Sequence, residues 1–225
     1  MTATNESHPF AMPALSTTFS PALSPAFSPA FSLAGLCAGF DDPVHQSQQV
    51  FRRALTALSE PGTVQNVPEI PAPEGVHIAS YQLCLTLLDA ETPLWIAPAL
   101  RTDALVSALR FHCGCRLVDE PGQAEFALIP PDFDGDLTYF AQGSHEYPDR
   151  STTVIVQVES LDADSTWALR GPGIDGVRTV GIAGLDRRWP GMLADNCRQF
   201  PCGVDLLFTA GTALMGLPRT TRVEI

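Results

Sequence analysis

Asp103-Ala-Leu-Val-Ser-Ala-Leu-Arg-Phe-His-Cys-Gly-Cys115 is the stretch that decides the fold, because it predicts a short helix, marked at both ends, that follows a buried strand. The Asp103 carboxylate can accept hydrogen bonds from the free amides of a first turn, and Gly114 suits the left-handed residue that ends a helix. We therefore predict a helix over 104–113. Four residues at helical spacing are expected to face inward in it: Leu105, Ala108, Leu109 and His112.

The end of this helix carries the densest group of reactive side chains in the sequence, with Arg110, His112, Cys113 and Cys115 within six residues. One interpretation is a core histidine with a single satisfied hydrogen bond. A zinc site that also uses Cys84 is a second, but one residue between Cys113 and Cys115 is fewer than structural zinc sites use. A cysteine nucleophile paired with histidine is a third, although no thiol is marked as the activated one. We predict neither a metal site nor a catalytic residue.

Helices and short strands alternate on both sides of this stretch. Asp42 and Pro43 begin a helix that ends at Pro61-Gly62. Two apolar columns are expected to face inward in that helix: Val50, Ala54 and Leu58, and Phe51 and Leu55. Short strands are predicted over 63–67, 93–97 and 124–129, with further helices over 78–89 and 137–142.

The later part of the chain predicts strands joined by turns. Strands are expected over 151–160, 166–170 and 177–182, then a helix over 187–200, a hairpin over 204–217 and a last strand over 221–225. Gly171-Pro-Gly-Ile-Asp-Gly176 has the letters of a dinucleotide fingerprint, but a strand follows where that motif requires a helix, so we interpret it as a turn. Together the elements predict an α/β domain with a mixed sheet and helices on its faces.

A low-complexity leader precedes this domain. Ser20-Pro-Ala-Leu, Ser24-Pro-Ala-Phe and Ser28-Pro-Ala-Phe repeat with a period of four. Proline removes amide donors and prevents regular helix or sheet, so residues 1–39 are expected to be disordered. They lack the positively charged start of a signal peptide. We predict a single folded domain over 40–225.

Composition excludes several classes of function. The chain of 225 residues has a net charge of −12, and its 13 basic residues are all arginine. An acidic surface repels phosphate backbones and anionic lipid, so we expect neither a nucleic-acid nor a membrane partner. Without lysine the chain cannot form a Schiff base with an aldehyde cofactor or build a P-loop, and we expect no cofactor. Six cysteines without a disulfide framework favour reduced thiols and a cytoplasmic location.

Pro218-Arg-Thr-Thr221, between two predicted strands, is a second candidate site. Guanidinium groups match phosphate oxygens in pairs and hydroxyls add donors, so this segment could cradle an anion. An arginine that caps the end of a sheet explains the same pattern. The candidate ligand-binding residues are Arg110, His112, Arg219, Thr220 and Thr221.

Many segments of residues 40–225 together resemble the H subunit of the bacterial carbon–phosphorus lyase system. In the first half they are Phe40-Asp-Asp-Pro-Val44, Gln48, Phe51-Arg52, Ser59-Glu-Pro-Gly62, Leu87-Leu-Asp89, Thr92-Pro-Leu-Trp95 and Leu109-Arg-Phe-His112. In the second half they are Ser151-Thr-Thr-Val154, Leu169, Gly171-Pro-Gly-Ile174, Phe200-Pro201, Gly203-Val-Asp-Leu206 and Pro218-Arg-Thr-Thr221. Cys113, Cys115 and the leader depart from the family pattern.

The resemblance implies a three-layer α/β/α sandwich with a mixed sheet, similar to the large domain of pyridoxal-phosphate-dependent transferases but without the cofactor lysine. It also implies a cytoplasmic homodimer that assembles with the G, I and J subunits in phosphonate catabolism. In that system the I subunit, helped by G, H and L, displaces adenine from ATP with the phosphonate to give a ribose 1-phosphonate 5-triphosphate. The J subunit then cleaves the carbon–phosphorus bond, and no catalytic step is assigned to H.

Two hypotheses follow from the sequence. The first is a required, non-catalytic subunit of this transferase and carbon–phosphorus lyase complex. The second is a protein that binds phosphate or phosphonate in a vestigial cofactor cleft through Arg110, His112 and Arg219.

Overall fold

The computed structural model describes residues 1–2, 36–162, 164 and 167–224, so most of the predicted leader lies outside the described residues. The main sheet of the described part has six strands in the order β1 (Val64–Asn66), β8 (Ala213–Leu217), β7 (Asp205–Ala210), β4 (Thr153–Gln157), β3 (Phe126–Ile129) and β2 (Leu94–Ile96). β2, β3, β4 and β7 are parallel, whereas β8 runs antiparallel to both of its neighbours. The predicted mixed sheet is therefore confirmed.

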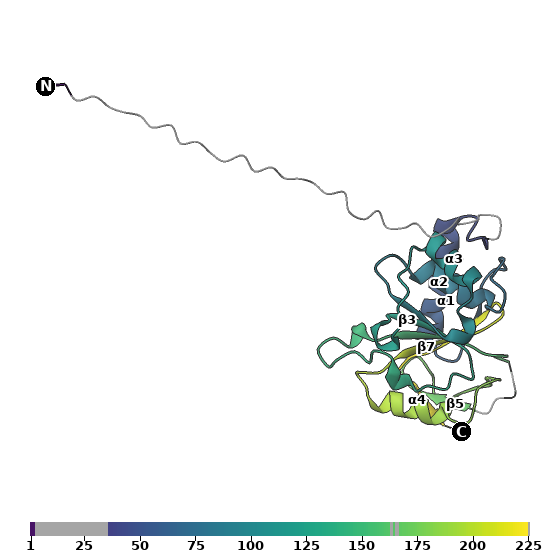
Figure 1. Cartoon of the computed structure of the whole chain (residues 1–225). Coiled ribbons are helices and arrows are strands. Elements are labelled where there is room, and N and C mark those ends of the chain that lie inside the picture. Colours follow the sequence, from purple (N-terminus) through teal and green to yellow (C-terminus); the bar gives the residue numbers. More distant parts are fainter. Residues whose placement is uncertain (3–35, 163, 165–166, 225) are drawn as a thin grey trace. The chain divides into compact units, whose positions relative to one another are not determined.

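Three helices cover one face of this sheet: α1 (Pro43–Ser59), α2 (Ile78–Leu87) and α3 (Asp103–His112). Side chains of successive strand residues point to opposite faces, and β4 shows this alternation, since Ile155 packs with the three helices while Val154 and Val156 pack on the other side. Figure 1 shows α1, α2 and α3 gathered on one side of β3 and β7.

The other face is covered by α4 (Trp189–Arg198) and by a small sheet in the order β6 (Arg178–Val180), β5 (Trp167–Arg170) and β9 (Arg222–Glu224). Figure 1 shows α4 and β5 on the side of the main sheet opposite the three helices. The described part thus contains four α-helices, and the outer layer on this face is part helix and part sheet. The layer differs from the expected helical one because β5 pairs with β6 and β9 and not with β4.

Four of the five predicted helices are present within a few residues of their expected bounds, and the predicted one over 137–142 is not an α-helix. Asp42 caps α1 as predicted, by accepting a hydrogen bond from the His45 amide. The N-cap of α3 is Thr102, one residue before the predicted Asp103, because the Thr102 hydroxyl accepts from the Leu105 amide at 3.2 Å. Gly114 has the expected left-handed backbone, with φ of 65°.

The second apolar column predicted for α1 is wrong. Phe51 and Leu55 are 46% and 50% exposed, and the buried residues of the helix are Val50, Ala54 and Ala57. Helix α1 packs so closely on β8 that a Cβ on Gly216 would lie 2.6 Å from the carbonyl oxygen of Ala57. This contact fixes the rotation of the helix and leaves the column of Phe51 facing outward.

The predicted helix over 137–142 is a single 3₁₀ turn, Leu137–Tyr139, begun by the Asp136 carboxylate accepting from the Thr138 amide. Gln142 leaves the helical path because its side-chain amide donates to the carbonyl oxygens of Leu137 and Phe140. Within the described residues, every helix is too short or too polar to cross a membrane.

Candidate functional site

The end of α3 does not hold its histidine in the core. His112 is exposed, which corrects the prediction that its ring faces inward with Leu105 and Leu109. Its Nε2 lies 2.9 Å from the carbonyl oxygen of Cys37, and its ring packs so close to Gly39 that a Cβ there would lie 2.7 Å from Nδ1. The predicted single hydrogen bond exists, but it fastens the segment before α1 to the surface of α3.

Tyr81 of α2 makes a second contact with the same segment. Its hydroxyl donates to the carbonyl oxygen of Ala38 at 3.1 Å, and its ring is fully buried. Burial raises the pKa of this phenol well above its ordinary value. His112 and Tyr81 therefore both act on residues 37 and 38, which gives the histidine a structural role in this conformation.

The cysteines beside α3 are protected thiols. Cys84 and Cys115 are buried, and the Cys113 thiol donates to the carbonyl oxygen of Cys84 at 3.6 Å. Burial raises the pKa of all three thiols, that of Cys113 to about 12, while the charge of exposed Arg110 opposes the shift at Cys115. Thiols of this kind are poor nucleophiles at neutral pH. Among the described residues no three histidine, cysteine or acidic side chains are grouped as metal ligands.

Arg219 forms the most extensive polar contacts of the predicted site residues. Its Nε and backbone amide donate to Asp205 Oδ1 at 3.1 and 2.9 Å, and its Nη2 lies 2.5 Å from Asp205 Oδ2. The other donors reach the Ser151 hydroxyl and the carbonyl oxygens of Pro148 and Pro201. The Arg219 side chain is only 12% exposed and that of Asp205 27%.

This arrangement connects the ends of three segments at the amino-terminal edge of the parallel strands. Asp205 begins β7, Ser151 precedes β4, and Arg219 follows β8. A planar guanidinium suits the task because it bonds a carboxylate in two places and still has donors for carbonyl oxygens. The geometry matches the second interpretation of Pro218-Arg-Thr-Thr221, an arginine that caps a sheet end.

The two threonines differ in their surroundings. Thr221 is 4% exposed, its amide donates to the Pro218 carbonyl oxygen at 2.8 Å, and its hydroxyl has no hydrogen-bond partner among the described residues. Thr220 is half-buried and lines an open hollow of about 340 Å³ with Arg219, Phe200 and Pro148. No described hydrogen bond or ion pair links Arg219, Thr220 or Thr221 to Arg110 or His112, and of the five candidates only Arg219 and Thr220 line this hollow.

The carboxyl-terminal edge of the parallel strands, where open α/β sheets usually bind ligands, is filled by the chain itself. The Gln157 side chain accepts from the His77 amide at 2.7 Å and donates to the Gly75 carbonyl oxygen at 3.0 Å. Thr209 of β7 bonds the Ser80 hydroxyl at 2.7 Å, and its carbonyl oxygen lies 2.9 Å from His77 Nδ1. These polar contacts anchor the start of α2 on β4 and β7.

Sequence reasoning missed this second polar group. Gln157 is a polar residue inside the apolar run from Val154 to Val158, and that interruption was the available signal. A buried polar side chain in a strand needs a partner, and here its partners lie about eighty residues earlier in the chain.

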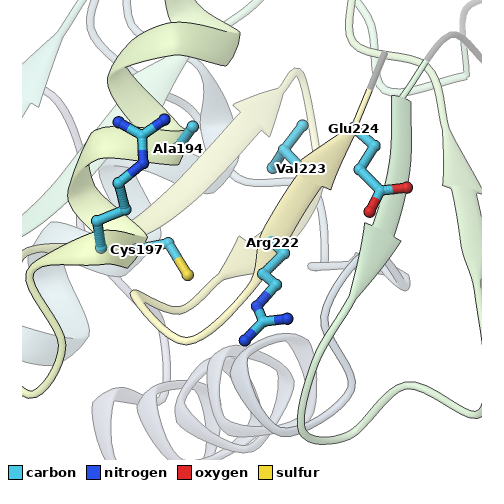
Figure 2. Close-up of a pocket in the computed structure, with 6 residues that line it drawn as sticks. Ala194, Cys197, Arg222, Val223 and Glu224 are labelled. Atoms are coloured by element: carbon cyan, nitrogen blue, oxygen red, sulfur yellow. The ribbon is translucent and has the colours of Figure 1, made fainter.

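A further hollow of about 530 Å³ lies between α4 and β9. Figure 2 shows Cys197 of α4 and Arg222 of β9 on its two sides. Two of its charged lining residues are already paired, Arg198 with Asp195 and Glu224 with Arg170. It therefore offers a mixed-charge surface and not a site of one sign.

Comparisons with known proteins identify relatives of this chain. Residues 38–224 match the family model described as bacterial phosphonate metabolism protein (PhnH). The chain is 37% identical to alpha-D-ribose 1-methylphosphonate 5-triphosphate synthase subunit PhnH of Rhizobium meliloti (strain 1021), over 82% of this chain and 94% of the relative. It is 31% identical to the putative C-P lyase subunit protein HtxG of Stutzerimonas stutzeri, over 80% of this chain and 87% of the relative.

Proposed function

The chain belongs to the bacterial phosphonate metabolism protein (PhnH) family, and from this premise we propose that it is a required, non-catalytic subunit of a carbon–phosphorus lyase complex. In this role it supports the formation of ribose 1-phosphonate 5-triphosphate from ATP and an alkylphosphonate. The observation that carries the proposal is the 37% identity to a synthase subunit over 94% of that relative's length.

The finer parts of the proposal concern partners and architecture. We propose that residues 40–225 form its single α/β domain, resembling the large domain of pyridoxal-phosphate-dependent transferases, that the protein works as a cytoplasmic homodimer, and that it assembles with the G, I and J subunits. The filled carboxyl-terminal edge supports a role without a cofactor, because Gln157 and Thr209 bond the chain's own residues there. The same fold can carry different functions, so a chain with this edge occupied can act through the surfaces that contact its partner subunits.

Co-expression with the other subunits tests the proposal. A tagged chain is expected to retain the G, I and J subunits on affinity resin and through size exclusion, and the full set is expected to release adenine from ATP when a phosphonate is present. Omitting this chain should abolish that release. If the tagged chain retains none of the three subunits, the subunit role is contradicted. If the isolated chain releases adenine, the non-catalytic role is contradicted.

A second candidate function is binding of phosphate or phosphonate at Arg110, His112, Arg219, Thr220 and Thr221. The hollow that Arg219 and Thr220 line favours it, and the engagement of Arg219 with Asp205 weighs against it. Calorimetry with a phosphonate, ATP and pyridoxal phosphate tests it. Heat that disappears in Arg219→Ala supports this function, whereas no heat from any of the three compounds contradicts it.

A further inference from the structure

A third hollow, of about 500 Å³, lies between α1 and β1 and the segment that follows β1. Its described lining residues are Gln49, Arg52, Arg53, Thr56, Asn66, Val67 and Pro68. The volume is within the range of small-molecule sites. The lining is unusual for a chain of net charge −12, since it holds two cations and its described residues include no carboxylate.

The guanidinium groups of Arg52 and Arg53 have fewer polar partners than that of Arg219. Neither Arg52 nor Arg53 forms an ion pair with a described residue. Arg53 is held toward β1 by one long hydrogen bond, from its Nη1 to Gln65 Oε1 at 3.4 Å. Consecutive helix positions diverge by about 100°, so two adjacent arginines that line one hollow approach its contents from different directions.

A neutral amide donor extends the lining. Gln49 lies one turn before Arg53 on α1, on the same face as both arginines, and its side-chain amide can donate to an anion in the hollow. The Thr56 hydroxyl is not a donor to the hollow, because it donates to the Arg52 carbonyl oxygen at 3.0 Å. The described lining therefore offers two guanidinium groups and a side-chain amide, and no carboxylate.

We propose that this hollow binds a small phosphorus oxyanion, such as inorganic phosphate or the phosphate chain of a larger molecule. Guanidinium groups recognise such oxyanions because their planar forks match pairs of oxygens, and amide donors extend the contact without adding charge. The surrounding negative charge of the chain lowers the affinity for any anion, so a site that survives it depends on these particular donors. The site goes beyond the proposed subunit role and does not depend on it.

Calorimetry of the full chain with inorganic phosphate and with tripolyphosphate tests the site. Arg52→Gln and Arg53→Gln are each expected to weaken binding at least about tenfold, because each removes a charged hydrogen-bond donor. Gln49→Glu, which places a carboxylate beside both arginines at nearly constant shape, should weaken it as strongly. Arg187→Gln is the matched control, since Arg187 is an exposed arginine outside this lining and its loss changes the net charge equally.

Three outcomes overturn the inference: no heat from either phosphate probe, equal weakening in Arg187→Gln, or equal heat from succinate, which carries carboxylates alone. Thermal unfolding of each variant confirms that these surface substitutions leave the fold intact. Retention of the I subunit is measured on the same proteins, so loss of the anion site and failure of the subunit role are distinguished.

Discussion

Replacing Asp205 with alanine tests whether the Arg219 contact holds the edge of the sheet together. The substitution removes the acceptor of three hydrogen bonds and leaves a guanidinium that is 12% exposed without a counter-charge. Breaking a buried ion pair from one side costs about 3–5 kcal/mol, and the 27% exposure of Asp205 lets solvent reduce that cost. We expect a loss of about 2–3 kcal/mol in the free energy of unfolding.

Urea unfolding measures this loss as a lower midpoint at unchanged slope. Asp205→Asn keeps the shape and should lose about half as much, because a neutral acceptor makes weaker bonds to a cation. Adding Arg219→Met to Asp205→Ala should restore part of the stability, since the unpaired charge is gone. Asp195→Ala is the control, because Asp195 pairs with Arg198 on the exposed side of α4. Equal midpoints for Asp205→Ala and Asp195→Ala would refute the structural role of the contact.

Gly216→Ala should lower the free energy of unfolding by about 1–3 kcal/mol, because the added Cβ would lie 2.6 Å from the carbonyl oxygen of Ala57 in α1. Gly191→Ala should not destabilise the protein, since the space around Gly191 on α4 is open, and thermal unfolding compares the two variants. At pH 8 iodoacetamide should label Cys202 before Cys113, because burial raises the pKa of the Cys113 thiol to about 12. Peptide mass spectrometry measures the order of labelling, and faster labelling of Cys113 would contradict the raised pKa. Hydrogen bonds from His45 lower the pKa of Asp42 below 3.8, so the Asp42 carboxylate stabilises the fold only above that lowered pKa. The difference in urea midpoint between Asp42→Ala and the parent should therefore shrink as the pH falls through it, and a difference that does not change with pH would contradict the capping role.

The elements that sequence reasoning predicted are those whose ends are set by neighbours in the chain. Asp42 and Gly114 act within four residues of the helix they bound, so their effect is visible in the letters. The rotation of a helix is set by what packs against it, and that is why the columns of Phe51 and His112 were misjudged. The contact of Ala57 with Gly216 and the bond from His112 to Cys37 span about 160 and 75 residues, and no local spacing records them.

At the candidate site, too, local sequence indicated the residue but not its long-range contacts. Arg219 was noticed for its chemistry, but its use depends on Asp205, 14 residues away, and on Ser151, 68 residues away. The pattern left two interpretations open because a fork that fits phosphate also fits a carboxylate. Only the folded arrangement shows that the carboxylate of β7 already lies in that fork.

The absence of lysine makes arginine the basic side chain for every task in this chain, so an arginine's surroundings indicate its task better than its presence does. Arg219 donates hydrogen bonds to Asp205, Ser151 and two carbonyl oxygens. A ligand at Arg219 would have to displace these bonds, which hold three segments together. Arg52 and Arg53 line a hollow with few such commitments. An incoming oxyanion would therefore gain new hydrogen bonds at α1 but only exchange existing ones beside β7, and this difference favours the proposed site in the α1 hollow over one at Arg219.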